Sequence, residues 1–168
     1  MKDEIETIAI CRASVAGLEA AFALVEEYFA RVGVVWRESR EEFSEEYFGD
    51  GRGFWLARSE GQLAGCIGLR TLNRASDNDG RKQSCAEIKR MYVRERFRGR
   101  GIAQRLLEAA EDYARGAGYS WIYLDTTDGM VAAARLYERN GYERCERYNE
   151  NPQATIFMKK KLQLLGVQ

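Results

Sequence analysis

A strand, a glycine-containing turn, a long helix and a second strand follow one another in the middle of this sequence, and they constrain its fold more than any other part. Cys85–Arg94 is strand-like, Gly101–Ala117 has apolar residues at helical spacing, and Ser120–Thr126 reads as a short buried strand. Two strands joined by a helix lie parallel in one sheet with a right-handed crossover. The sequence therefore predicts a sheet with at least one parallel pair.

The rest of the chain predicts mainly antiparallel strands. The further elements expected are a strand at Thr7–Arg12, a helix capped by Ser14 and running to Phe29, a helix at Arg37–Phe48, a hairpin of Phe54–Arg58 and Leu63–Leu72 with Gly61 in its turn, a helix at Gly129–Asn140, and strands at Tyr142–Tyr148 and Ala154–Leu162. Residues 73–84 are polar and predict a loop. The order β-α-α-β-β-β-α-β-α-β-β predicts an α/β (α+β) fold, with a mixed, mostly antiparallel sheet of six to seven strands and about four helices on both faces.

Length and charge favour one neutral domain over residues 1–168. The chain has 168 residues, of which 45% are hydrophobic, enough for one ordinary core, and no repeat or proline-rich linker divides it. Lysine plus arginine and aspartate plus glutamate both total 26, so no global field favours nucleic acid or an anionic membrane. The acidic start and the lack of a long apolar stretch favour neither a signal peptide nor a membrane span, and we expect a cytoplasmic protein.

The residue types that are missing also limit the chemistry. The chain has no histidine, which excludes Ser-His and Cys-His nucleophilic pairs and histidine metal ligands. Its four cysteines are widely spaced without a C-x-x-C, so we expect reduced thiols rather than disulfides or a zinc site, and no metal cofactor. Acid–base steps then depend on carboxylate, tyrosine, lysine, cysteine or water.

The segment R-F-R-G-R-G-I-A, residues 96–103, joins the central strand to the long helix. Its glycines let the backbone approach a ligand, and the amides at a helix start favour an anion. Seven basic residues against two acidic ones between Glu87 and Arg105 also favour a phosphate-bearing partner. A P-loop is excluded because G-x-x-x-x-G-K-[ST] is missing, and a dinucleotide fingerprint because Gln104 stands where a third glycine is needed. An ordinary helix-start turn with solvated arginines is the alternative.

The same segment matches R-x-x-G-x-G, and together with E-I-K-R-M-Y-V before it and L-Y-E-R-N-G-Y after it the chain resembles the GNAT acetyltransferases. The resemblance implies acetyl-CoA as co-substrate. It implies that main-chain groups of the central strand pair with the pantetheine arm where the sheet splays, and that amides from Arg98 to Ala103 hold the pyrophosphate. The cofactor-binding residues it implies are Met91, Tyr92, Val93, Arg96, Arg98, Gly99, Arg100, Gly101, Ile102, Ala103 and Met130.

The resemblance also implies the catalytic groups. Tyr137 occupies the position of the tyrosine that protonates the leaving thiolate, with a packed aromatic as the alternative. Glu87 occupies the position of a carboxylate that takes the proton of the ammonium directly or through water, with a surface ion pair to Lys89 or Arg90 as the alternative. Met130 stands where many relatives have asparagine. Tyr148 and Asn149 lie on a loop that some members lay across the acceptor side, and a simple connection between strands explains it equally well.

These features predict an N-acetyltransferase that moves an acetyl group from acetyl-CoA to a primary amine by direct attack, without a covalent enzyme intermediate. The acceptor stays unidentified, with a small amine or amino acid favoured over a protein. Six acidic residues between Arg37 and Asp50 hint at a cationic acceptor. The alternative function is a catalytically silent domain that binds acyl-CoA as a sensor or partner module. Nucleic-acid binding through the arginines is disfavoured by the neutral net charge, and a homodimer stays open.

Overall fold

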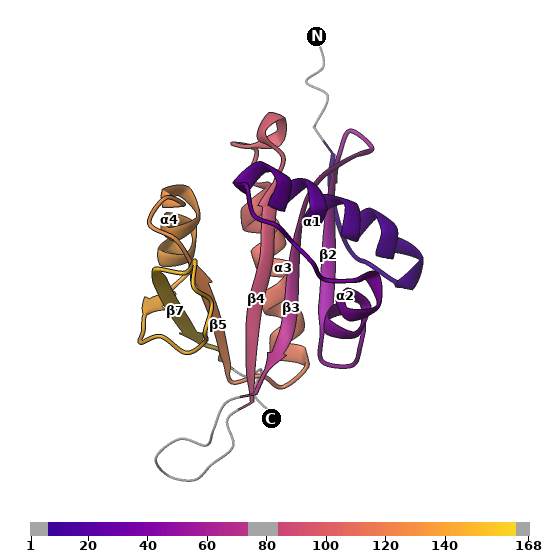
Figure 1. The fold of residues 1–168 in the computed structure, drawn as a ribbon. Helices are drawn as coiled ribbons and strands as arrows, with labels where there is room; N and C mark the ends of the chain where they lie inside the picture. The colour runs from indigo at the N-terminus through magenta and orange to yellow at the C-terminus, as the bar shows by residue number, and fades with distance from the viewer. Residues whose placement is uncertain (1–6, 74–83, 164–168) are drawn as a thin grey trace. The chain divides into compact units, whose positions relative to one another are not determined.

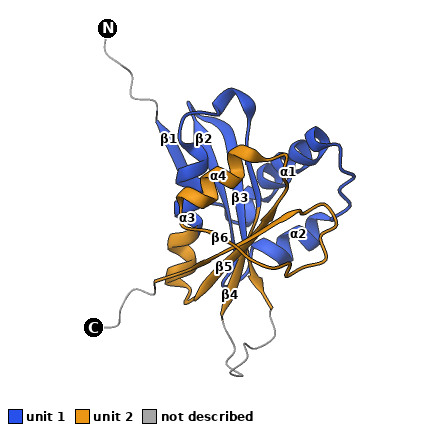
Figure 2. Ribbon diagram, turned by 90° about the vertical axis from the view of Figure 1, so that its left-hand side faces the viewer, with its two compact units in different colours: residues 1–69, 90–110 blue, residues 70–89, 111–168 orange. Residues whose placement is uncertain are grey.

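The computed structural model describes residues 7–73 and 84–163, which form two compact units. The first contains residues 1–69 and 90–110, and the second residues 70–89 and 111–168 (Figure 2). The predicted loop at residues 73–84 falls almost entirely outside the described residues. The prediction of one domain over the whole chain stays a prediction.

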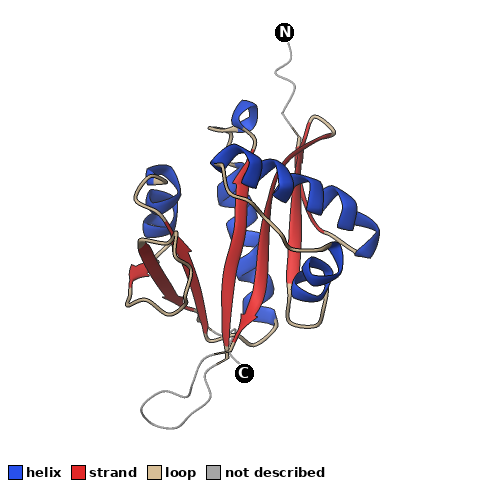
Figure 3. Ribbon diagram, viewed as in Figure 1, coloured by secondary structure: helices blue, strands red, loops and turns tan. Residues whose placement is uncertain are grey.

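Within the described residues, seven strands and four α-helices follow one another in the order that the sequence predicts (Figures 1 and 3). Their bounds are β1 Ile8–Arg12, α1 Leu18–Val32, α2 Arg40–Tyr47, β2 Gly53–Ser59, β3 Gln62–Leu72, β4 Cys85–Val93, α3 Ile102–Gly116, β5 Trp121–Thr126, α4 Val131–Arg139, β6 Glu143–Arg144 and β7 Ile156–Lys161. Neighbouring strands of the sheet follow the order β1-β2-β3-β4-β5-β7-β6. β4 and β5 pair in parallel, from Cys85 opposite Trp121 to Ile88 opposite Leu124, which confirms the predicted crossover.

The first unit packs two helices on a sheet around an aromatic core. Helices α1 and α2 lie on one face of β2, β3 and β4, and the first part of α3 lies on the other (Figure 1). Apolar residues recur every three or four positions along α1, so one side of the helix is buried against the sheet. The buried members of this core are Ala21, Phe22, Leu24, Val25, Phe43, Tyr47, Phe54, Leu56, Cys66 and Tyr92.

The hairpin between β2 and β3 has the predicted turn. Glu60 has φ 52° and Gly61 has φ 74°, and two successive residues with positive φ are typical of a tight two-residue hairpin turn. Farther along β3, the chain passes very close to β4. A Cβ atom built on Gly65 would lie 2.5 Å from the carbonyl oxygen of Tyr92, so only glycine fits there.

The start of α1 differs from the prediction that Ser14 caps this helix. A 3-10 turn at Val15–Gly17 comes first, and the side chain of Ser14 makes no capping hydrogen bond. Gly17 is the N-cap of α1. The true capping box lies at α2, where Ser39 Oγ accepts from the amide of Glu42 at 3.1 Å and the Glu42 carboxylate accepts from the amide of Ser39 at 2.8 Å.

The second unit contains the antiparallel pairs of β5 with β7 and of β7 with β6. All six residues of β5 pair with β7, from Trp121 opposite Lys161 to Thr126 opposite Ile156. The predicted strand at Tyr142–Tyr148 is too long, because β6 contains only Glu143 and Arg144. The following residues form a loop instead, since their side chains bond to carboxylates of β4 and β5, as described below.

No helix within the described part of the chain combines the length and the apolar character needed to cross a membrane.

Candidate active site

The turn before α3, residues 98–103, is called the glycine turn below. Gly99 has φ 76° and Gly101 has φ 75°, and atoms built at their Cβ positions meet nothing within 4 Å. The first hydrogen bond of the helix runs from the amide of Arg105 to the carbonyl of Gly101, at 3.1 Å. The amides of the residues just before Arg105 therefore have no acceptor within the helix and point out of its N-terminal end, where anions are favoured.

The basic residues around the glycine turn fall into two groups. Arg96, Arg98 and Arg100 are exposed, and their partners include Gln62 at 2.6 Å for Arg96, the Val93 carbonyl at 3.0 Å for Arg98, and Glu60 at 3.4 Å for Arg100. The other four basic side chains of this stretch bind elsewhere in the protein: Lys89 to Asp125, Arg90 to Glu38, Arg94 to Glu27 and Arg105 to the Ile8 carbonyl. The predicted phosphate patch is thus reduced to three arginines.

Three residues predicted to bind the cofactor follow one another on β4. Met91 and Val93 are half-buried, and the Val93 carbonyl accepts from Nε of Arg98 at 3.0 Å. Tyr92 is 5% exposed and its hydroxyl donates to Glu27 Oε1 at 2.9 Å, so its side chain belongs to the core. The side chain of Ile102 is also buried, at 1% exposure. For Tyr92 and Ile102, only main-chain groups are available to a ligand.

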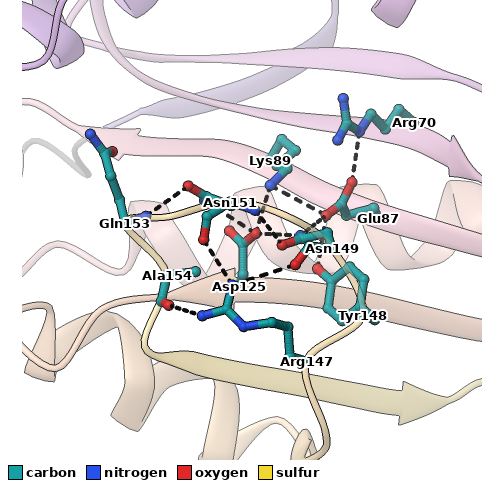
Figure 4. Close-up of polar contacts among 10 residues, drawn as sticks. All are labelled: Arg70, Glu87, Lys89, Asp125, Arg147, Tyr148, Asn149, Asn151, Gln153 and Ala154. Atoms are coloured by element: carbon teal, nitrogen blue, oxygen red, sulfur yellow. Dashed lines mark hydrogen bonds and ion pairs between the residues drawn. The ribbon is translucent and has the colours of Figure 1, made fainter.

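Glu87 lies at the centre of a buried polar group in the second unit (Figure 4). Its side chain is 0% exposed, and both oxygens are occupied. Oε2 accepts from Arg70 Nε at 2.7 Å, while Oε1 accepts from the Tyr148 hydroxyl at 2.8 Å and from Asn149 Nδ2 at 3.2 Å. Lys89 Nζ lies 3.3 Å from Oε1. The structure therefore brings together three predicted site residues, Glu87, Tyr148 and Asn149.

A second carboxylate completes this group. Asp125 Oδ2 accepts from Lys89 Nζ at 2.9 Å, from Asn149 Nδ2 at 2.6 Å and from Asn151 Nδ2 at 3.3 Å. We call the whole set the carboxylate cluster: Arg70, Glu87, Lys89, Asp125, Tyr148, Asn149 and Asn151. Its two acidic and two basic side chains balance in charge, which is how buried charges are tolerated.

The carboxylate cluster shifts two pKa values. Burial by itself would raise the pKa of Asp125, but the charge and hydrogen bond of Lys89, with the bonds from Asn149 and Asn151, hold it below the ordinary value. Burial, followed by the negative charge of Glu87, raises the pKa of Tyr148, so this residue is a neutral phenol at physiological pH. Arg147 bonds to carbonyls of Asn151 and Ala154, which holds the loop itself in shape.

Tyr137 lies on α4 and is 4% exposed. Its ring packs edge-on against Tyr142 at 5.7 Å between centroids, and its carbonyl accepts from the Tyr142 amide at 3.1 Å. The Tyr142 hydroxyl is buried without a hydrogen-bond partner among the described residues. Burial, then the charge of Glu111, raises the pKa of Tyr142. Met130 is the N-cap of α4 and makes no side-chain capping bond.

Sequence reasoning missed part of the carboxylate cluster. Arg70 and Asn151 were not expected there. Alternation along β4 puts Glu87 and Lys89 on one face of the strand, which was a usable signal for their contact. Glu87 does pair with Lys89 but not with Arg90, and it is buried rather than at the surface.

Other candidate groups are modest. Within residues 7–73 and 84–163, no three histidine, cysteine, aspartate or glutamate side chains gather as a metal site. The four cysteines are free thiols, with Cys66 and Cys85 buried. The acidic residues around α2 line a hollow of about 570 Å³ with Arg37 and Arg52.

Comparison with known proteins gives one consistent result. The model of the acetyltransferase (GNAT) family matches residues 18–142. An uncharacterized N-acetyltransferase of Schizosaccharomyces pombe is 31% identical over 77% of this chain and 78% of its own length. An uncharacterized N-acetyltransferase of Escherichia coli is also 31% identical, over 61% of this chain, and the chain spans only 58% of its length. A solved predicted acetyltransferase of Clostridium acetobutylicum with acetyl-CoA has a TM-score of 0.73 at 14% identity, covering 86% of this chain and 95% of that one.

Proposed function

Since this chain belongs to the GNAT acetyltransferase family, we propose that it is an enzyme that transfers an acetyl group from acetyl-CoA to a primary amine by direct attack on the thioester. The observation that carries the proposal is the glycine turn. Gly99 and Gly101 leave open space where side chains would stand, beside amides at the start of α3 and three exposed arginines. This arrangement fits a diphosphate, and the relative from Clostridium acetobutylicum was solved with acetyl-CoA.

The glycine turn and β4 bind and orient the co-substrate in this proposal. Amides from Arg98 to Ala103 hold the diphosphate, and Arg96, Arg98 and Arg100 supply charge. Main-chain groups of Met91 to Val93 pair with the pantetheine arm, which displaces Arg98 from the Val93 carbonyl. A main-chain N–H of the same stretch stabilises the oxyanion, and Met130 packs against the arm. No metal takes part.

Glu87 is the base that removes a proton from the ammonium. Because Tyr148 already donates to Glu87 Oε1, the proton reaches Glu87 through a relay, formed by the Tyr148 hydroxyl or by a water molecule. In the Tyr148 relay, the ammonium proton goes to the Tyr148 oxygen while the phenol proton moves to Glu87. Asn149 holds the same carboxylate and contacts the acceptor. The raised pKa of Tyr148 keeps the phenol neutral before and after the transfer.

Tyr137 is the acid. The amine nitrogen forms a bond to the thioester carbon, the carbon–sulfur bond breaks, and the phenol of Tyr137 gives its proton to the sulfur, which leaves as the free thiol. The second proton that nitrogen loses passes to solvent. The acceptor is a small amine or amino acid in this proposal rather than a protein.

The experiment follows coenzyme A release from acetyl-CoA with a panel of primary amines. Tyr137→Phe is expected to lower kcat on the order of 100-fold while the Kd for acetyl-CoA stays unchanged. Tyr142→Phe is the matched control, because it removes a neighbouring buried hydroxyl that has no partner within the described residues.

Two results would contradict the proposal. If acetyl-CoA does not bind in titration calorimetry, neither transfer nor coenzyme sensing is tenable. If acetyl-CoA binds but no amine raises the rate above background, the chain is the silent acyl-CoA-binding domain instead.

A further inference from the structure

Arg90 adopts a costly backbone conformation in the middle of β4. Its φ is 57°, and among the described residues only it and Glu60 have positive φ without being glycine. Glu60 lies in a hairpin turn, where such angles are usual, whereas Arg90 lies inside a strand. The parallel register of β4 with β5 covers residues 85–88, so the unusual angle comes just after that register.

The side chain of Arg90 lies on an aromatic surface. Its Cζ is 4.9 Å from the centroid of the Phe29 ring and 6.0 Å from that of Trp36. These two rings stack on each other at 5.4 Å with an interplanar angle of 22°. A guanidinium over aromatic faces is held in place without using its hydrogen-bond donors, because the attraction acts through the ring faces.

Arg90 uses few of its donors. Nη2 contacts Glu38 Oε2 at 3.3 Å, which is long for a charged hydrogen bond, and the same oxygen accepts from Trp36 Nε1 at 3.0 Å. Nε is buried and has no partner among the described residues. A buried donor without a partner is rare in a folded protein and needs an explanation.

Arg94, four residues later on the same chain, shows what a structural arginine looks like here. Its Nε and Nη2 bind the Glu27 carboxylate at 2.7 to 3.1 Å, and its Nη1 donates to the Leu63 carbonyl at 2.8 Å. All three nitrogens are occupied with good geometry. Arg90 has a similar exposure, 20% against 27%, but lacks such partners.

We propose that Arg90 binds a carboxylate of the acetyl acceptor, so that the acceptor is an amino acid or a similar amine that bears a carboxylate. This inference rests on the proposed function and gives its substrate class. Among the described residues, the Nη groups of Arg90 bond only to Glu38, through Nη2 at 3.3 Å, and these two groups fit a planar carboxylate in two parallel bonds. Phe29 and Trp36 hold the guanidinium in place for this contact.

The experiment compares acceptors that differ only in the carboxylate. The twenty common amino acids, their carboxamides and the corresponding decarboxylated amines are offered with acetyl-CoA, and coenzyme A is measured by chromatography. For the preferred side chain, kcat/KM is expected to be about tenfold or more higher for the acid than for its carboxamide. Arg90→Gln lowers kcat/KM for the acid far more than for the carboxamide and so removes this preference, while Arg90→Lys keeps part of it.

The outcomes separate the inference from the function. Equal rates for acids and carboxamides in the unmodified protein, or an equal loss for both in Arg90→Gln, overturn the carboxylate site and identify Arg90 as a tether for Glu38. If no amine is acetylated, the proposed function fails. Calorimetry of the same acids with the acetyl-CoA complex then decides the role of Arg90: binding that Arg90→Gln abolishes supports the site, and no binding overturns it. Melting curves of both variants check that they fold.

Discussion

The glycine turn keeps its charged side chains at the surface, whereas the carboxylate cluster keeps its charges inside the protein. In the turn, the groups proposed to bind are main-chain amides and three exposed arginines, of which Arg96 bonds to Gln62 at 2.6 Å and Arg100 lies 3.4 Å from Glu60. In the cluster, both carboxylate oxygens of Glu87 and Oδ2 of Asp125 accept hydrogen bonds from protein donors, and Glu87 is 0% exposed. The turn leaves its groups open to the proposed ligand, whereas the polar atoms of the cluster already bind one another.

The largest expected effect is on the cluster. Glu87→Gln replaces an acceptor by a group whose amide hydrogens face Tyr148, Asn149 and Lys89, and it leaves two cations with one carboxylate. We expect a loss of about 3 to 5 kcal/mol in the free energy of unfolding, measured with urea, together with a fall in kcat on the order of 100-fold.

Tyr148→Phe separates these two effects. It keeps the charge balance and removes one donor, so its loss of stability is expected to be smaller while the fall in kcat is retained. If Glu87→Gln unfolds as easily as the unmodified protein, the cluster is not the self-contained unit that its contacts indicate.

The next effect concerns the turn. Gly101→Ala places a side chain at φ 75°, which costs on the order of 1 kcal/mol, and brings a methyl group next to the amides that hold the diphosphate. Gly118→Ala is the matched control, because Gly118 has φ 83° at the other end of α3. Both variants are expected to lose similar stability, but only Gly101→Ala weakens acetyl-CoA binding in calorimetry. Equal Kd values for the two variants would remove the turn from the coenzyme site.

Unfolding at acidic pH tests the carboxylate cluster separately from the glycine turn. The folded protein holds the pKa of Asp125 below its ordinary value of 3.8, so the stability from this group is fully present above that value and is lost as the pH falls through the lower folded-state pKa. Urea unfolding at a series of pH values below 4 is expected to show a smaller pH dependence for Asp125→Asn than for the unmodified protein. The control is Asp128→Asn, at an exposed aspartate. An unchanged slope in Asp125→Asn contradicts the proposed pairing with Lys89.

The smallest effect is expected from one arginine of the turn. Arg100 is exposed and lies 3.4 Å from Glu60, so Arg100→Gln should weaken acetyl-CoA binding by about twofold to fivefold, and added salt should reduce the difference. Arg31, exposed and paired with Glu95 in the same unit, gives the control variant Arg31→Gln. A tenfold or larger loss would mean that charge, rather than the main chain, dominates binding at the turn.

The helices and strands were predicted well from the sequence, because the spacing of hydrophobic residues and the positions of glycines are local properties. The crossover, the hairpin at Gly61 and the helix ending at Gly116 all follow from such signals. The errors have local causes too. Ser14 looked like a cap because its residue type favours one, but a 3-10 turn intervenes. The strand after Tyr142 ends early because side chains of the loop find better acceptors in Glu87 and Asp125.

The site was predictable where the main chain forms it and less so where side chains from distant segments meet. Gly99 and Gly101 were singled out by their spacing together with the motifs on either side of them. The contact of Arg70 with Glu87 joins residues 17 apart, and that of Tyr148 with Glu87 joins residues 61 apart. Such contacts depend on strand register and on the path of a loop, which no local pattern contains. Arg90 was considered only as one of seven basic residues and as an alternative ion-pair partner of Glu87, because its backbone angle and unpaired Nε are properties of the folded chain.

The close passage of β3 over β4 at Gly65 matters for attempts to change the acceptor by directed evolution. Every mutation of that codon that introduces a side chain would push against the Tyr92 carbonyl, two residues from Arg90. Libraries should therefore leave position 65 fixed, and they should also keep Phe29 and Trp36, whose rings hold Arg90. Clones that do carry a change at 65 would be recovered mainly as poorly folded protein.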